Sequence, residues 1–205
     1  MKHGLAELVC ILDRSGSMGS MRQEAIGGIN AFIEEQKKVP GEAKLTIVLF
    51  DNEYLLASNR EPIQNVKLFD ETTYQPRGTT ALLDAVGRTI LDIGRILDNT
   101  PDAEKPETVV VAILTDGEEN ASKDFKKEKI KEMIEHQQTK YGWKFIFLAA
   151  DPKAFADATQ HYGIKVADAR LFDSSAKGVR DSYSTLSARV TSYRGGGSSG
   201  GGKAA

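Results

Sequence analysis

The feature that most constrains the fold is an apolar run over residues 8–12 that stops abruptly at an aspartate, Asp13. An apolar run without polar alternation is typical of a strand that is buried on both faces, as in the middle of a parallel sheet. Three more apolar segments stop at or just before an aspartate, and these aspartates are Asp51, Asp116 and Asp151. Because helical patterns separate the segments, the sequence predicts an α/β fold.

The order of the segments makes this prediction more specific. Buried strands are predicted over residues 8–12, 44–50, 108–114 and 143–150, with a last short strand within 164–172. Helices are predicted over residues 21–33, 81–97, 124–140, 155–161 and 176–193. Residues 54–56 and 66–69 have the composition of short edge strands. Since crossovers are right-handed, we expect a doubly wound, Rossmann-like, mostly parallel sheet with one antiparallel edge strand and helices on both faces.

The length of the chain, 205 residues, is compatible with one domain. Residues 195–205 are mostly glycine and serine and cannot form a core, so we predict a domain over residues 1–194 and a disordered tail over 195–205. We expect no signal peptide, and no apolar stretch comes near the roughly 20 residues needed to span a bilayer. The single cysteine, Cys10, is compatible with a reducing compartment. We therefore expect a cytoplasmic protein that does not bind a membrane.

The charge balance argues against a nucleic-acid partner. Lys and Arg together number 27, Asp and Glu together number 29, and the formal net charge is −2. A dedicated nucleic-acid-binding domain usually carries a basic face and a pI above about 9, whereas the sequence pI is about 6.0.

Oxygen donors gather where the predicted strands end. Asp13 is followed by two hydroxyl side chains, Ser15 and Ser17, and Asp116 lies between a threonine and a glycine. The carboxyl ends of parallel strands meet at one edge of a sheet, where open α/β sheets bind ligands. Carboxylate and hydroxyl oxygens suit Mg²⁺, Mn²⁺ or Ca²⁺. The sequence therefore predicts a divalent-metal site there, whereas Asp51 and Asp151 are interpreted as caps of the helices that follow them.

Three segments in this order resemble the metal-ion-dependent adhesion site (MIDAS) of von Willebrand factor A-type (vWA) domains. They are Asp13-x-Ser15-x-Ser17, Gly78-Thr79-Thr80-Ala81-Leu82 and Thr115-Asp116-Gly117. The resemblance covers about residues 5–172 and is to free-standing domains of bacterial or phage systems. It implies that three hydroxyls coordinate the metal and that two carboxylates bind it directly or through water. The implied ligands are Asp13, Ser15, Ser17, Thr80 and Asp116, with Thr79 as the alternative to Thr80.

The resemblance also implies how such a site works. An Asp or Glu of a partner protein fills the remaining position on the metal, so the domain is a docking module and not an enzyme. The alternative is a metal-dependent phosphoryl-transfer or hydrolytic enzyme that uses Asp13 as its nucleophile. Such enzymes usually carry a second carboxylate two residues further on, where this chain has Ser15. We therefore predict metal-dependent protein binding.

Overall fold

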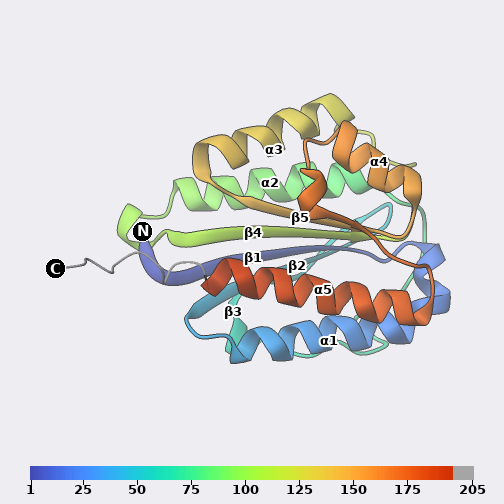
Figure 1. The fold of residues 1–205 in the computed structure, drawn as a ribbon, viewed down its shortest axis with the longest axis horizontal. Coiled ribbons are helices and arrows are strands. Elements are labelled where there is room, and N and C mark those ends of the chain that lie inside the picture. The colour runs from blue at the N-terminus through green and yellow to red at the C-terminus, as the bar shows by residue number, and fades with distance from the viewer. Residues whose placement is uncertain (196–205) are drawn as a thin grey trace.

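The computed structural model describes residues 1–195, which form one sheet between two layers of helices (Figure 1). The strands are β1 (Lys2–Asp13), β2 (Glu42–Phe50), β3 (Tyr54–Pro62), β4 (Pro106–Thr115), β5 (Lys144–Ala149) and β6 (Ala169–Leu171). Their order in the sheet is β3-β2-β1-β4-β5-β6. Only β3 runs antiparallel to its neighbour. The predicted fold class is confirmed.

Helices cover both faces of the sheet (Figure 1). On one face lie α1 (Arg22–Lys38) and α5 (Ala176–Gly195), and on the other lie α2 (Leu82–Asp98), α3 (Lys127–Tyr141) and α4 (Pro152–Gln160). In β1, Leu8, Cys10 and Leu12 join the core against α1 and α5, and Val9 and Ile11 join the core on the other face. This two-sided burial explains why residues 8–12 include no polar side chain.

The strand register brings the predicted site residues to one edge. Asp13 pairs with Phe50 of β2, and Leu12 pairs with Leu114 of β4. Asp51 therefore follows β2 beside the end of β1, and Asp116 follows β4 on its other side. The three aspartates therefore lie at the same edge of the sheet, although more than 100 residues separate the first from the last.

One predicted strand is absent. Residues 66–69 follow a short 3-10 helix, η2 (Ile63–Asn65), as irregular chain. Val66 and Phe69 are buried because this segment packs against α1. The side chain of Asn30 accepts a hydrogen bond from Phe69 N (2.7 Å) and donates one to Phe69 O (2.9 Å). An asparagine thus satisfies the backbone that a neighbouring strand would otherwise pair.

The closing helix α5 extends to Gly195, the first residue of the predicted tail. Residues 196–205 lie outside the described part of the chain, so the predicted tail is not tested. None of the helices described between residues 1 and 195 has the length and apolar character needed to cross a membrane.

Close packing of α1 on α5 depends on Gly28. A Cβ atom added to Gly28 would lie 2.2 Å from Cδ2 of Tyr183 in α5, which is far inside van der Waals contact. A Cβ added to the preceding residue, Gly27, would meet nothing within 4 Å. Comparing substitutions at these two glycines therefore separates the effect of packing against Tyr183 from the general effect of glycine on helix stability.

We expect Gly28→Ala to lower the free energy of unfolding by about 1–3 kcal/mol, because the added methyl group forces Tyr183 out of its buried position. The matched control, Gly27→Ala, should leave stability unchanged or raise it by up to about 1 kcal/mol, since alanine is the better helix former. Urea denaturation of both variants measures these changes. Equal effects of the two substitutions would contradict the packing argument.

Candidate metal centre

The candidate site begins with Asp13, the last residue of the central strand β1. Asp13 is only 1% exposed. Ser15 N donates a hydrogen bond to Asp13 Oδ1 (2.7 Å), and Thr115 Oγ1 donates one to Asp13 Oδ2 (2.5 Å). Burial raises the pKa of the Asp13 carboxyl to about 6, although these two hydrogen bonds lower it. A divalent cation would have the opposite effect and favour the ionised carboxylate.

A chain of oxygen atoms leads from Ser15 to the loop after β4. Ser15 Oγ lies 3.0 Å from Ser17 Oγ, and Ser17 Oγ donates a hydrogen bond to Asp116 Oδ1 (2.8 Å). Burial also raises the pKa of Asp116, and the hydrogen bond from Ser17 opposes that shift. The structure thus brings two carboxylates and two hydroxyls into one cluster at the carboxyl ends of β1 and β4.

Thr80 completes this cluster from the loop before α2. Thr80 is buried, whereas Thr79 is exposed. A Cβ atom added to Gly117 would lie 3.7 Å from Thr80 Oγ1 and 4.0 Å from Ser17 Oγ. Both hydroxyls therefore face the same small space, which the glycine leaves open. All five residues predicted from the sequence lie together at this edge of the sheet.

Asn120 is a site residue that the sequence analysis missed. Its side-chain Oδ1 accepts a hydrogen bond from Thr80 N (2.9 Å), and its backbone N donates one to Thr80 O (3.0 Å). These two bonds join the loop that carries Thr80 to the loop that carries Asp116. An asparagine in a polar loop has no spacing signal that could have indicated this contact.

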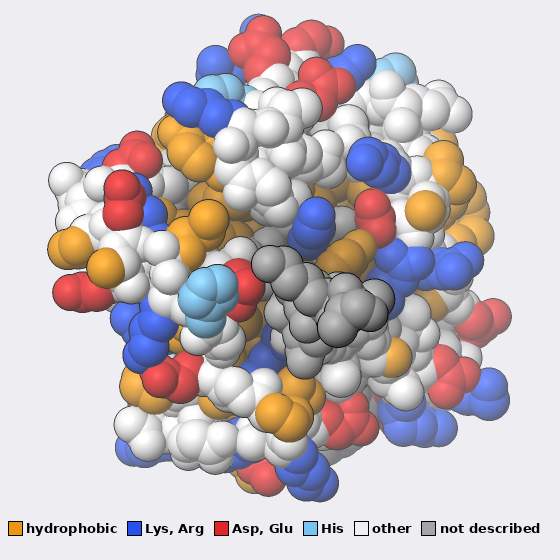
Figure 2. Space-filling view, turned by 60° about the vertical axis from the view of Figure 1, so that its left-hand side comes forward, with side chains coloured by type: hydrophobic (Ala, Val, Ile, Leu, Met, Phe, Trp, Pro, Cys, Tyr) orange, Lys and Arg blue, Asp and Glu red, His pale blue; other side chains and the backbone are white. Residues whose placement is uncertain are grey.

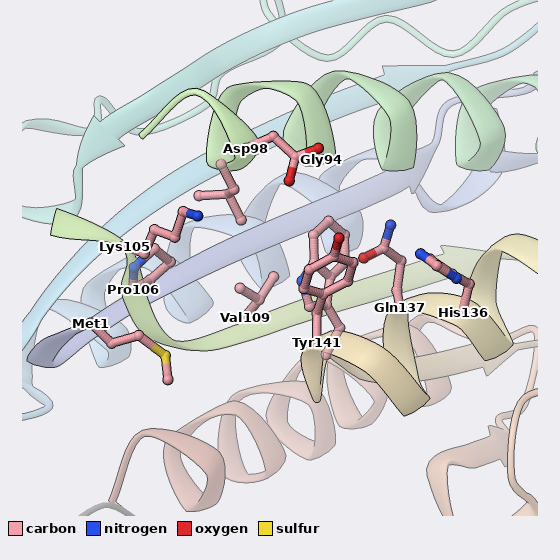
Figure 3. A pocket seen from close by; sticks show the side chains of 11 residues that line it. Met1, Gly94, Asp98, Lys105, Pro106, Val109, His136, Gln137 and Tyr141 are labelled. Atoms are coloured by element: carbon pink, nitrogen blue, oxygen red, sulfur yellow. The ribbon is translucent and has the colours of Figure 1, made fainter. Parts of the chain in front are cut away.

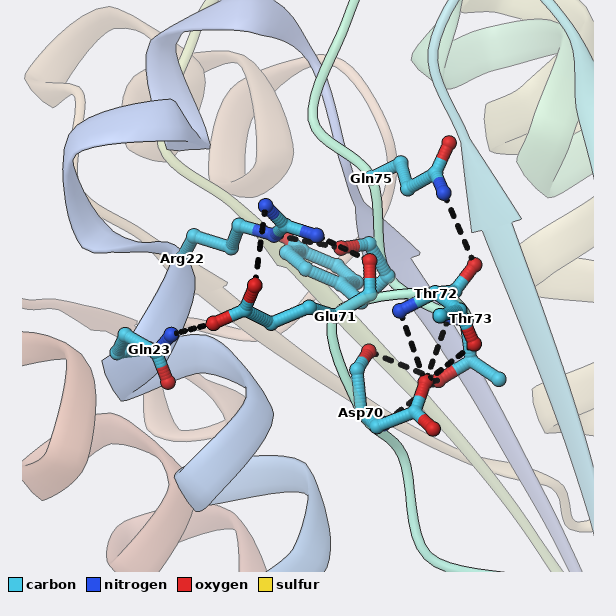
Figure 4. A network of polar contacts seen from close by, with 8 residues as sticks. Arg22, Gln23, Asp70, Glu71, Thr72, Thr73 and Gln75 are labelled. Atoms are coloured by element: carbon cyan, nitrogen blue, oxygen red, sulfur yellow. Dashed lines mark hydrogen bonds and ion pairs between the residues drawn. The ribbon is translucent and has the colours of Figure 1, made fainter.

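Tyr74 contacts the backbone of Asp13 and is a second site residue that the sequence does not indicate. The fully buried Tyr74 donates a hydrogen bond from its hydroxyl to Asp13 O (2.5 Å). Its own carbonyl accepts one from Arg22 Nε at the start of α1 (3.0 Å). Within the same loop, Asp70 Oδ1 accepts from Thr72 N (2.8 Å) and Thr73 N (3.0 Å) (Figure 4). The loop is therefore ordered by its own hydrogen bonds and by α1.

The other two strand-end aspartates have different roles. Asp151 caps α4, since its side chain accepts hydrogen bonds from Lys153 N and Ala154 N (both 2.8 Å), and this confirms the prediction. Asp51 caps no helix, so that interpretation was wrong. A turn and then the antiparallel strand β3 follow Asp51.

Few other groups in the described residues could form a metal site. No cluster of three or more His, Cys, Asp or Glu side chains that could hold a metal occurs within residues 1–195. A cavity of about 180 Å³ lies between α2, α3 and the start of β4, and Trp143, Gln137 and Asp98 are among its lining residues (Figure 3). None of the five predicted ligands lines this cavity. The cluster at the carboxyl ends of β1 and β4 is therefore the candidate metal centre.

Comparisons with known proteins support the fold. No protein-family model and no curated protein matches the sequence. The PilB minor pilin from Streptococcus sanguinis superimposes with a TM-score of 0.64 at 10% identity, covering 91% of this chain and 61% of the pilin. A von Willebrand factor type A structure from Catenulispora acidiphila gives 0.57 at 14% identity, covering 90% of this chain and 42% of the other.

A third similar structure carries a metal. It is proximal thread matrix protein 1 from the mussel byssus, with a zinc-occupied MIDAS motif (TM-score 0.62, 15% identity, 91% of this chain and 46% of that protein covered). This chain thus spans about half the length of these proteins. At such low identity the likeness concerns the fold, and the fold of this chain is vWA-like.

We expect Asn120→Ala to lower the free energy of unfolding of the metal-free protein by about 1 kcal/mol, because the buried Thr80 N loses its acceptor. Asn120→Asp keeps an acceptor oxygen at the same place and should lose less. Urea denaturation in the presence of a chelator measures both values. Equal losses for the two variants would show that the Asn120 oxygen does not hold Thr80.

Proposed function

We propose that this chain is a divalent-cation-dependent protein-binding domain whose metal is completed by an Asp or Glu of a partner protein. The observation that carries the proposal is the cluster of oxygen donors that the fold assembles from three separate segments. The proposed ligands are Asp13, Ser15, Ser17, Thr80 and Asp116. Asp13, Ser15 and Thr80 are buried, and hydrogen bonds join the two serines to the two carboxylates, which supports a preformed site.

The charges of the donor set favour docking of a carboxylate. Two carboxylates, Asp13 and Asp116, balance the charge of a divalent cation, and three hydroxyls add none. Such a cation keeps an affinity for a further anionic oxygen, which a partner's side chain can supply. Because the donors are hard oxygens, we propose Mg²⁺ as the physiological metal, with Mn²⁺ or Ca²⁺ as alternatives. The zinc in the mussel protein supports a divalent ion in this fold.

The geometry also favours binding over catalysis by Asp13. Both of its carboxylate oxygens accept hydrogen bonds within the protein, from Ser15 N and from Thr115 Oγ1. Ser15 occupies the position of the general acid that the enzymatic alternative needs. We therefore propose that the chain is not an enzyme. A cytoplasmic location and a bacterial or phage origin stay predictions.

We expect the wild-type chain to bind Mg²⁺ or Mn²⁺ and Asp13→Ala to abolish this binding, because the substitution removes one of the two carboxylates. Calorimetric titration measures the affinity, and circular dichroism verifies that the variant folds. As the matched control, Asp151→Ala removes a strand-end aspartate that only caps a helix and should bind the metal normally. Unchanged affinity in Asp13→Ala would overturn the proposed site.

The docking role needs a separate test. An immobilised chain should retain a partner from native lysate in Mg²⁺ and release it in a chelator. The Asp13→Ala variant should retain none under either condition. If the partner is retained equally well in the chelator and by the Asp13→Ala variant, the contact is not mediated by a metal.

The buried threonine, Thr80, should matter more than its exposed neighbour. We expect Thr80→Ala to weaken Mn²⁺ binding by about tenfold, since it removes a ligand oxygen, and Thr79→Ala to change it less than twofold. Titration of the two variants side by side measures the difference. A stronger effect of Thr79→Ala would assign the ligand to Thr79.

A further inference from the structure

We propose that Asp51 is a positioning residue of the metal centre, which holds the Thr80 loop against the end of β1 without binding the metal itself. This inference rests on the proposed function. The sequence alone predicts that Asp51 caps a helix, and the resemblance to vWA domains implies no role for this residue. The structure shows instead a fully buried carboxylate beside the site.

The Asp51 carboxylate contacts both segments that must be aligned. Arg77 precedes Thr80 by three residues in the loop before α2, and it donates a hydrogen bond from Nε to Asp51 Oδ2 (3.0 Å). Arg14, the residue after Asp13, places its Nε 3.1 Å from the same oxygen. That N–H does not point at the oxygen, so the contact is an ion pair rather than a hydrogen bond. The other oxygen, Oδ1, accepts from Glu53 N (2.6 Å).

The main chain of Asp51 holds the other end of the loop. Asp51 O accepts a hydrogen bond from the N of Ala81, the residue directly after Thr80 (2.9 Å). The loop is also joined to the end of β1, since Arg77 N donates to Arg14 O (2.8 Å) and Gly16 N donates to Gly78 O (3.2 Å). One residue therefore anchors the loop on both sides of Thr80, at Arg77 through its side chain and at Ala81 through its carbonyl.

The loop passes close to the turn after β2 at Gly78. Gly78 has φ +66°, and a Cβ atom added to it would lie 2.0 Å from Oδ1 of Asn52, the neighbour of Asp51. The position of Thr80 is thus set by contacts with the turn after β2 as well as with β1.

Charge compensation makes Asp51 difficult to replace. The side chain of Arg14 is 8% exposed and that of Asp51 is 0% exposed. In Asp51→Asn the amide nitrogen would have to face either Arg77 Nε–H or Glu53 N–H, so one donor would face another donor. The buried Arg14 charge would then lie uncompensated beside a site meant for a cation. Both effects weaken metal binding.

The test measures Mn²⁺ affinity of the full 205-residue chain by calorimetry, at a temperature well below the melting point of every variant. We expect Asp51→Asn to weaken binding by about tenfold. Asp151→Asn, the matched control, changes the charge by the same amount at another strand end and should bind within about twofold of wild type. Equal weakening by both variants would overturn the inference, since it would reflect charge or stability alone.

A second variant separates positioning from electrostatics and decides the matter if Asp51→Asn does not fold. Arg77 is half-exposed, so Arg77→Gln should keep the fold. It removes a positive charge, which by electrostatics alone would strengthen cation binding. If the Arg77–Asp51 contact positions the loop, Arg77→Gln instead weakens Mn²⁺ binding, by about threefold. Unchanged or stronger binding would overturn the inference.

The outcomes also distinguish this inference from the proposed function. If the wild-type chain binds no Mn²⁺, or if Asp13→Ala binds it normally, the proposed function fails and this inference fails with it. If the wild-type chain binds and Asp13→Ala does not, the site stands. Unchanged affinity in Asp51→Asn and Arg77→Gln would then overturn only the role of Asp51.

Discussion

Burial of the Asp13 carboxylate at the end of the central strand is the constraint on which the rest of the site depends. A buried carboxylate is costly unless its oxygens accept hydrogen bonds. Here Ser15 N, from the segment directly after β1, and Thr115 Oγ1, from the end of β4, supply them. The remaining cost appears as a raised pKa. A cation at this point would relieve it, so the same burial that strains the metal-free domain favours the metal-bound one.

The loop after β4 and the start of α2 are joined by reciprocal hydrogen bonds, which add to the contacts within the site. Glu119 Oε2 accepts a hydrogen bond from Leu83 N (2.9 Å), and Ser122 Oγ accepts one from Asp84 N (3.0 Å), so the loop after β4 caps the start of α2. In return the Asp84 carboxylate accepts from three backbone N–H groups of that loop, those of Lys123, Asp124 and Phe125. The loops that carry Thr80 and Asp116 therefore form one rigid unit with α2.

The comparisons show the fold of this chain, whereas the proposed function rests on the chemistry of its own residues. Similar backbones in a pilin, a byssus protein and a bacterial vWA domain show the architecture. The sequence identity between these proteins and this chain is too low for a function to be transferred, since one fold can host many functions. The case for metal-dependent docking therefore depends on the donor atoms of this chain and on their charge balance.

The layers of this protein and the five candidate ligands follow from the sequence alone. Continuous apolar runs and period-3.6 patterns depend on local burial, which neighbouring residues reveal, and the aspartates that end the apolar runs mark one sheet edge. Which polar residues support that edge follows only from the folded structure. Asn120 meets Thr80, Tyr74 meets Asp13, and Asp51 meets Arg77, each across at least 26 residues of chain. The same limit explains residues 66–69, whose apolar side chains signal burial equally well in a strand and in a loop packed on a helix. Such contacts depend on where the folded chain brings distant segments together, and no local pattern encodes that.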